Sequence, residues 1–374
     1  MNVIFTCGGT GGHINPAIAV ANTLKERCPD CNILFIGNKG GMEERLVPKA
    51  GYELKTITVA GLTRSLKPEA IARNVRGVFR TISGLAQVRR IIKEFKPHVV
   101  VGTGGYVCFP ALFIVSKMGV PTCVHEANAV PGLATRMLAG SVDKILVCFE
   151  ESKARYSQHH KVEAVGMPVR KEFFDGDRSA ARAQLKLDDR PLIVSAFGSL
   201  GAQQMNKAMA QFMKLEQDAG CPWQHIHATG KMGWEWMPQL VKQTGVELEQ
   251  CPGIDMIEYI YNMPTLMAAA DLIIGRAGSG SCNEIAASGT PSILIPSPNV
   301  TDNHQEKNAQ VLADRGGCIM IKESECSGKR LYEEAKALLA DDSRRADMRK
   351  ALLDWVVPDS AERICDCIVE LSRR

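Results

Sequence analysis

The chain has 374 residues and a formal net charge of +4, with 45% apolar and 23% charged residues. This length allows two domains with separate cores, and the composition is ordinary for a soluble α/β protein. No run approaches the roughly 18 apolar residues of a membrane-spanning helix, and residues 1–5 lack the features of a signal peptide. The 13 cysteines are scattered and odd in number, which favours reduced, cytosolic thiols.

The first half predicts alternating strands and helices. We expect strands over 2–6, 32–36, 54–59, 98–102, 121–125 and 144–148, and helices over 15–27, 42–50, about 70–95 and 109–118. The second half repeats the rhythm, with strands over 192–197, 224–229, 246–250, 271–275 and 292–296 and helices over 203–219, 263–269 and 281–288. Such alternation predicts an α/β protein with two doubly wound parallel sheets.

The chain is expected to pass between two domains near residues 165–170. We therefore assign an N-terminal domain to 1–164 and a C-terminal domain to 165–358. Pro358 interrupts the last helical stretch, so the tail, 359–374, is expected to bend back onto the first domain.

Three glycine-rich loops each follow an apolar strand and precede a helix: residues 8–13, 102–106 and 198–202. Such a loop leaves backbone N–H groups at the positive end of a helix, which is a ready anion site. Because these loops occur in both halves, the sequence predicts a large phosphate-bearing substrate held between two domains.

A further strand, glycine turn and helix occupy residues 271–288. We expect a serine to cap this helix and Gly289 to end it. The turn follows a parallel strand, where open α/β sheets bind ligands. Glu284, one turn into the helix, could accept two hydrogen bonds from a ribose diol.

Six motifs occur in an order that resembles one enzyme family. They are 8–13 with Asn15-Pro16, 102–106, His125-Glu126-Ala127-Asn128, 166–170, 198–202 and 278–284. Together they resemble the MurG-type glycosyltransferases of peptidoglycan synthesis over essentially the whole chain, although each glycine loop alone would be weak evidence.

The resemblance implies the GT-B fold, with two Rossmann-like domains facing across a cleft. The implied reaction moves N-acetylglucosamine from UDP-N-acetylglucosamine to the C4 hydroxyl of undecaprenyl-pyrophosphoryl-N-acetylmuramoyl-pentapeptide (lipid I), which yields lipid II. It inverts the anomeric centre and is expected to need no metal and no other cofactor. The second domain would bind the donor and the first the lipid acceptor.

The resemblance also implies the contact residues. Those to the donor are Thr10, Gly11, Gly12, Asn128, Arg170, Ser199, Ile260, Glu284 and Gln305. Ile260 would contact the uracil through its backbone and Glu284 the ribose, whereas Gln305 would reach the sugar hydroxyls. Arg170 and Ser199 would contact the diphosphate. Those to the acceptor are Gly104, Gly105, Tyr106 and His125.

His13 is the candidate general base for the C4 hydroxyl. It ends the first glycine loop, where the helix N-terminus lowers the pKa of an imidazole and keeps it neutral. The alternative is that His13 only orients the loop or donates to a phosphate. His125 and Glu126 form a competing pair, in which Glu126 acts as the base or holds His125.

Charge on the departing UDP could be stabilised by helix N-termini, Ser199 and Arg170 without a metal ion. The alternatives are that Ser199 caps its helix and that Arg170 makes a surface ion pair. Asp175-Gly176-Asp177 matches the metal signature of another glycosyltransferase class. Turn and cap chemistry explains that motif better.

Positive charge is concentrated in the first half. Residues 1–165 contain 21 basic and 12 acidic residues, whereas residues 166–374 contain 24 basic and 29 acidic residues. The basic and apolar segment 71–96 is expected to dock on an anionic membrane surface, at the cytoplasmic face of the inner membrane. The alternative is an amphipathic helix packed on its own sheet. No nucleic-acid-binding module is recognisable, so we expect no nucleic-acid partner.

Three other functions fit parts of the sequence. A UDP-N-acetylglucosamine 2-epimerase shares the two-domain layout, but the loop that carries His13 argues against it. A Rossmann dehydrogenase expects Gly-x-Gly-x-x-Gly and an acidic residue that ends the second strand, whereas residues 36–39 read Ile-Gly-Asn-Lys. A sugar-nucleotide binder without catalytic activity stays open on sequence alone.

Overall fold

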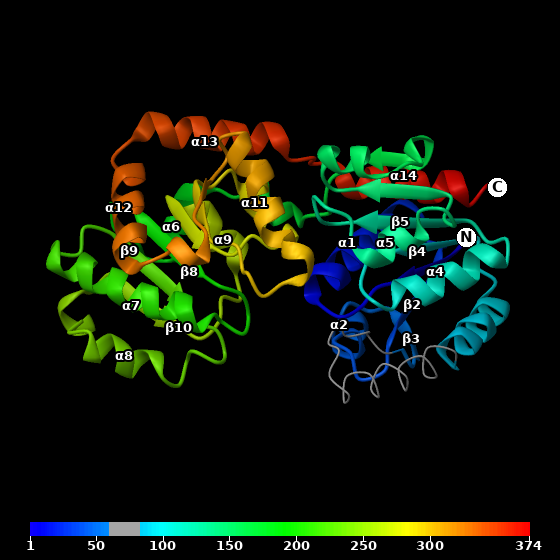
Figure 1. Cartoon of the computed structure of the whole chain (residues 1–374), viewed down its shortest axis with the longest axis horizontal. Coiled ribbons are helices and arrows are strands. Elements are labelled where there is room, and N and C mark those ends of the chain that lie inside the picture. Colours follow the sequence, from blue (N-terminus) through cyan, green and yellow to red (C-terminus); the bar gives the residue numbers. More distant parts are fainter. Residues whose placement is uncertain (60–82) are drawn as a thin grey trace. The chain divides into compact units, whose positions relative to one another are not determined.

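The computed structural model describes residues 1–59 and 83–374, which form two compact units (Figure 1). Unit 1 comprises Met1–Val169 and Val357–Arg374, and unit 2 comprises Arg170–Val356. Each unit contains a parallel sheet flanked by helices, in the manner of a Rossmann fold. Among the described residues, every helix is too short or too polar to cross a bilayer.

Unit 1 has a seven-stranded sheet of order β3-β2-β1-β4-β5-β6-β7. Its strands are β1 (Asn2–Thr6), β2 (Asn32–Asn38), β3 (Glu53–Ile57), β4 (Val99–Gly102), β5 (Thr122–Glu126), β6 (Lys144–Val147) and β7 (Val162–Ala164). Its helices are α1 (Gly11–Arg27), α2 (Glu43–Lys49), a helix described over 83–95, α4 (Cys108–Lys117), α5 (Leu133–Leu138) and α14 (Ser360–Leu371).

The C-terminal helix α14 packs within unit 1. Ile364, Ile368 and Leu371 are almost fully buried in the same core cluster as Val20 and Leu24 of α1. Full burial of each such aliphatic side chain contributes about 1.5–3 kcal/mol. The apolar face of α14 is therefore covered by α1, and the last 18 residues of the chain are part of unit 1.

The predicted basic helix over about 70–95 lies partly outside the described residues, which resume at residue 83. Within the described part, Val88, Ile91 and Ile92 are buried in a core cluster with Val100 and Leu112. The apolar face of residues 83–95 therefore packs within unit 1, while membrane docking by the exposed basic face stays a prediction.

Unit 2 has a six-stranded sheet of order β10-β9-β8-β11-β12-β13. Its strands are β8 (Leu192–Ala196), β9 (Gln224–Ala228), β10 (Ile254–Ile257), β11 (Leu272–Gly275), β12 (Ser292–Leu294) and β13 (Ile319–Met320). Its α-helices are α6 (Arg178–Gln184), α7 (Gln203–Asp218), α8 (Met237–Gln243), α9 (Met263–Ala269), α10 (Ser279–Ser288), α11 (His304–Asp314), α12 (Gly328–Leu339) and α13 (Asp342–Trp355).

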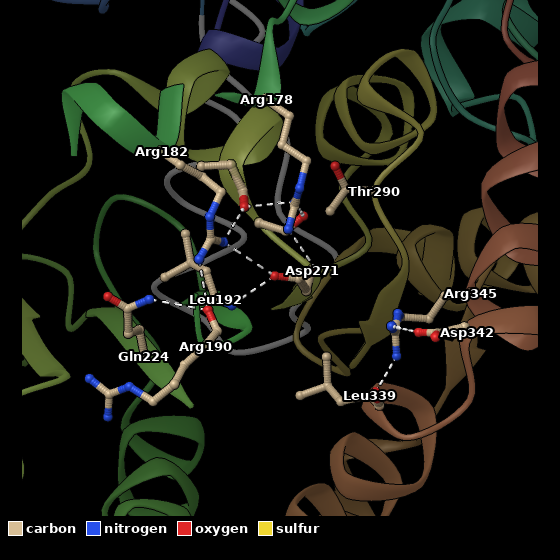
Figure 2. A network of polar contacts seen from close by, with 12 residues as sticks. Arg178, Arg182, Arg190, Leu192, Gln224, Asp271, Thr290, Leu339, Asp342 and Arg345 are labelled. Atoms are coloured by element: carbon tan, nitrogen blue, oxygen red, sulfur yellow. Dashed lines mark hydrogen bonds and ion pairs between the residues drawn. The ribbon is translucent and has the colours of Figure 1, made fainter. Parts of the chain in front are cut away.

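A polar network fixes the amino ends of two central strands of unit 2 (Figure 2). Asp271, just before β11, accepts hydrogen bonds from Arg178 Nη2 at 2.8 Å and from the backbone N–H of Leu192 at 2.9 Å. Arg178 also donates to the carbonyl oxygens of Ala269 and Ala270, which end helix α9. Asp271 therefore ties β8 to β11 at the edge opposite their carboxyl ends.

Three local predictions for unit 2 are wrong. The strand expected over 246–250 contains a 3-10 turn (Leu248–Gln250), and the strand that pairs with β9 is β10. Helix α10 begins after Gly278 without a side-chain cap, although Gly289 ends it in the left-handed conformation, as predicted. Cys221 and Cys251 form a disulfide, so the expectation of reduced thiols fails for this pair.

Candidate active site

The first glycine loop joins β1 to α1 in unit 1. Gly9 has a left-handed φ of 89°, and Thr10 precedes the helix in an extended conformation without a side-chain cap bond. The first amides of an α-helix have no acceptor within the helix. The N–H groups of Gly11 and Gly12, at the positive end of α1, can therefore bind an anion.

Glu43 lies beneath this loop and was missed from the sequence. Its carboxylate is fully buried, and Oε1 accepts a hydrogen bond from the Gly9 N–H at 3.0 Å. A Cβ atom at Gly8 or Gly41 would overlap this carboxylate. The sequence hints at a buried side chain here through these two glycines, because any larger residue at either position would collide with Glu43.

His13 lies in the first turn of α1 and contacts the loop that follows β4. Its Nδ1 is 3.1 Å from the carbonyl oxygen of Thr103, and Thr103 Oγ1 donates to the carbonyl oxygen of His13 at 2.6 Å. A carbonyl only accepts, so Nδ1 carries the ring proton and Nε2 is the basic nitrogen of the neutral imidazole. This tautomer is the one that the predicted general-base role of His13 uses.

The loop 102–106 is packed against the loop 8–13. A Cβ atom at Gly104, whose φ is 107°, would lie only 2.5 Å from His13 Nδ1, and one at Gly105 would overlap the carbonyl of Gly8. Tyr106 is 38% exposed, and its hydroxyl accepts a hydrogen bond from Asn38. The predicted acceptor residues Gly104, Gly105 and Tyr106 are therefore beside the predicted base.

His125 is buried at the end of β5. Its side chain is 1% exposed, and Nε2 donates to the carbonyl oxygen of Gly166 at 2.8 Å. Burial lowers the pKa of His125. The ring supports the backbone at Gly166 rather than facing solvent, which differs from the acceptor contact expected for it.

Glu126 organises the loop after β5. Its Oε1 accepts from the backbone and side-chain amides of Asn128 at 3.0 and 3.2 Å, and Oε2 accepts from the Gly132 N–H at 2.9 Å. Its side chain is only 4% exposed. Both oxygens of Glu126 therefore hold the loop 126–132 in place.

In unit 2 the loop 198–202 connects β8 to α7. Gly198 and Gly201 have left-handed φ angles of 89° and 79°, and the Gly201 N–H donates to the Gly198 carbonyl at 3.0 Å. Helix α7 begins at Gln203 with Ala202 in the cap position. Ser199 is exposed and does not cap the helix, so its hydroxyl can serve a ligand.

Arg170 and Glu284 share one electrostatic environment. The Arg170 guanidinium lies over the ring of Phe173, 5.1 Å from its centroid. Burial raises the pKa of Glu284 to about 7, and the charge of Arg170 opposes that rise. A carboxylate with such a pKa titrates near neutral pH, so the charge beside Arg170 depends on pH.

The remaining donor candidates also lie beyond the carboxyl ends of strands. Gln305 Oε1 accepts a hydrogen bond from the Ser297 N–H at 2.9 Å, which links the start of α11 to the segment after β12. Ile260 is buried between two exposed tyrosines, Tyr259 and Tyr261. Asp177, in contrast, caps helix α6 by accepting from two backbone amides, which confirms the cap interpretation of 175–177.

Strand register explains why these residues gather within each unit. In unit 1, Thr6 is opposite Gly102, and Gly102 is opposite Val124. In unit 2, Gly275 is opposite both Ala196 and Leu294. The loops that carry the candidate residues therefore leave the carboxyl edge of their own sheet, where α/β folds bind ligands.

Two family models match this chain. Residues 3–147 match the glycosyltransferase family 28 N-terminal domain, and residues 192–364 match the glycosyltransferase family 28 C-terminal domain. A UDP-N-acetylglucosamine–N-acetylmuramyl-(pentapeptide) pyrophosphoryl-undecaprenol N-acetylglucosamine transferase from Acetivibrio thermocellus is 40% identical and aligns over 100% of this chain and 99% of its own length. A transferase of that name from Desulforamulus reducens is 38% identical over the full length of both chains.

The chain belongs to the MurG family of glycosyltransferases. The crystal structure of Acinetobacter baumannii MurG superposes with a TM-score of 0.78 and 25% identity and covers 99% of both chains. A UDP-N-acetylglucosamine 2-epimerase from Neisseria meningitidis reaches a TM-score of 0.68 at 13% identity, over 99% of this chain and 100% of its own. The GT-B fold is thus common to transferases and epimerases, and sequence identity separates them.

Proposed function

We propose that this chain transfers N-acetylglucosamine from UDP-N-acetylglucosamine to the C4 hydroxyl of lipid I and so forms lipid II, with inversion and without a catalytic metal ion. The main support for the reaction is 40% identity over the whole chain to a transferase with that substrate in its name. Unit 2 binds the UDP sugar, and unit 1 binds the lipid acceptor.

His13 acts as the general base. Nε2 takes the proton of the C4 hydroxyl while that oxygen forms a bond to the anomeric carbon and the bond from this carbon to UDP breaks. The hydrogen bond from Nδ1–H to Thr103, at 3.1 Å, strengthens as the ring becomes positive. General-base catalysis of this kind contributes about 10²–10⁴-fold in rate.

UDP leaves with additional negative charge on its diphosphate. The Ser199 hydroxyl, the N-terminus of α7 and the Arg170 guanidinium stabilise that charge. One preorganised donor of this type contributes about 3–4 kcal/mol to the transition state. Glu284 accepts hydrogen bonds from the ribose diol, and Gln305 contacts the hydroxyls of the transferred sugar.

The reaction is tested with labelled UDP-N-acetylglucosamine and a lipid I analogue, with and without a chelator. Label that enters the lipid phase equally in both samples supports the proposal. Transfer that stops with chelator would contradict metal independence, and donor consumption without acceptor would instead indicate an epimerase.

Unit 1 also contacts the cytoplasmic face of the membrane that carries the acceptor, through the segment 71–96. Arg89 and Arg90 are exposed on the described part of that segment. On neighbouring α4, Phe113 is exposed and Lys117 Nζ lies 5.8 Å from the centroid of its ring. Exposed cations beside an aromatic ring suit an anionic lipid surface.

A further inference from the structure

A row of buried polar side chains lies between the sheet of unit 2 and helix α7. It consists of Glu216 on α7, His225 and His227 on β9, and Ser195 on β8, each at most 1% exposed. Ser195 and His227 are partners in the strand register. We call these four residues the buried network, and none of them belongs to the site described above.

The hydrogen bonds of the buried network are continuous. Glu216 Oε2 is 2.8 Å from His225 Nδ1, His225 Nε2 is 2.8 Å from Ser195 Oγ, and Ser195 Oγ is 2.7 Å from His227 Nδ1. The order carboxylate, imidazole, hydroxyl resembles a hydrolytic triad. Because Ser195 is fully buried, it cannot reach a substrate, so another role must be sought.

The chemistry of the groups sets the direction of these bonds. Ionised Glu216 only accepts, so His225 Nδ1 donates to it. When the His225 ring is neutral, its Nε2 accepts the single hydroxyl proton of Ser195, whereas a protonated ring would donate from Nε2 and reverse the bonds that follow. With the ring neutral, His227 must donate from Nδ1 to Ser195, and its Nε2 carries no proton. That nitrogen is buried and has no hydrogen-bond partner among the described residues. The protonation of the Glu216–His225 pair thus sets the tautomer of His227.

The two strands joined by the buried network carry interlocked loops at their carboxyl ends. The Lys231 N–H after β9 donates to the carbonyl oxygen of Ser199 after β8, at 3.1 Å. A Cβ atom at Gly201 would overlap the carbonyl oxygen of Thr229. Asn206 Nδ2 on α7 donates to that same carbonyl at 2.8 Å. A shift of either strand end would therefore move the Ser199 loop.

We propose that the buried network positions the Ser199 loop for the donor diphosphate. Its members are positioning residues, because they act on the donor only through β8 and β9. A continuous chain of buried hydrogen bonds resists a shift of either strand, since a break in it leaves buried polar groups unpaired. The inference rests on the proposed role of Ser199 in donor binding.

The first test is nitrogen-15 NMR of the histidine rings in the full chain, with His227 assigned from the His227→Gln variant. With His225 neutral we expect His227 to be protonated at Nδ1 and not at Nε2, and we expect Glu216→Leu, which removes the acceptor of His225 Nδ1, to shift the proton toward Nε2. A purely structural carboxylate would not alter a ring to which it is not bonded. A wild-type proton on Nε2 would overturn the derived direction.

The second test is calorimetric titration with UDP. Ser195→Ala interrupts the network and should weaken UDP binding about tenfold, because small misplacements in a binding site have effects of this size. Met209→Ala truncates a buried α7 side chain outside the network and serves as the control for lost stability. It should change UDP affinity less than about twofold at a comparable loss of Tm.

Ser199→Ala separates the two proposals. If Ser199→Ala weakens UDP binding and Ser195→Ala does not, the positioning role is wrong and the donor site stands. If Ser199→Ala itself binds UDP like the wild type, the proposed donor loop is wrong. Equal losses in Ser195→Ala and Met209→Ala would also overturn the positioning role.

Discussion

The imidazole of His13 and the carbonyl of Thr103 face each other at 3.1 Å, across two loops that are 90 residues apart in sequence. Because the carbonyl accepts, His13 has its proton on Nδ1 and its basic lone pair on Nε2. The same contact can hold the imidazolium that forms when the ring takes a proton. This relationship makes His13 the first residue to test.

His13→Ala should lower kcat by about 10²–10⁴-fold, the usual contribution of a general base. The affinity for UDP should be unchanged, because the proposed donor contacts of unit 2 are intact. Steady-state rates and UDP titration measure the two effects. A loss of kcat smaller than about tenfold would show that His13 only orients its loop.

Gly104→Ala should lower kcat without altering the fold. The new methyl group would lie 2.5 Å from His13 Nδ1, so the ring must move away from Thr103. Gly119→Ala is the matched control, since Gly119 has a φ of 74° and no atom within 4 Å of its Cβ position. Both variants should lose about 1 kcal/mol of unfolding free energy from backbone strain, but only Gly104→Ala should lose activity.

UDP affinity should fall as the pH drops below about 7, because the pKa of Glu284 is raised to about 7 and its ionised form accepts the ribose hydroxyls. The decrease can reach about tenfold per pH unit. Stability should change in the opposite direction. A carboxyl whose pKa is higher in the folded state stabilises the fold at low pH, and this contribution is lost between about pH 4.5 and 7.

UDP titrations and denaturant unfolding at several pH values check both trends. Glu284→Gln cannot titrate, so its UDP affinity should depend less on pH over this range than that of the wild type. An equal pH dependence in the two proteins would show that Glu284 is not the group responsible.

His227 should contribute the opposite trend and lower the unfolding free energy below about pH 6.5, so each contribution is measured as the difference between the wild type and the corresponding Gln variant. Burial lowers its pKa to about 3, so the unfolded chain takes up a proton that the folded chain refuses. The decrease should be about 1.4 kcal/mol per pH unit between pH 6 and 4. His227→Gln should reduce this slope, whereas replacement of the exposed His160 by Gln should leave it unchanged.

Charge reversal at Arg89 and Arg90 should weaken binding to anionic vesicles, because each basic residue near such a surface contributes about 1 kcal/mol. Flotation with anionic and neutral liposomes measures the effect. Lys350→Glu, at an exposed position of unit 2, is the control and should bind like the wild type. Equal flotation of the wild type with both lipid types would contradict docking on anionic lipid.

The order of apolar and polar residues along the chain predicted most of the strands and helices. The segments 99–101 and 192–196, for example, are strands as predicted, and their side chains are buried or nearly so. The strand expected over 246–250 failed, since the choice between that segment and β10 depends on pairing with β9. A strand is stabilised by a neighbouring strand that is distant in sequence, so the local pattern of residues 246–250 could not decide this pairing.

The sequence by itself determined where the chain turns and which loops can bind an anion, because glycine conformation and hydrophobic period are local properties. Only the tertiary structure decided which side chains are available for chemistry. In the folded chain both oxygens of Glu126 accept hydrogen bonds, and His125 is buried. Glu43 lies under the first glycine loop, and Ser199 does not cap helix α7. Burial and hydrogen-bond partners come from residues distant in sequence, so no local pattern contains them.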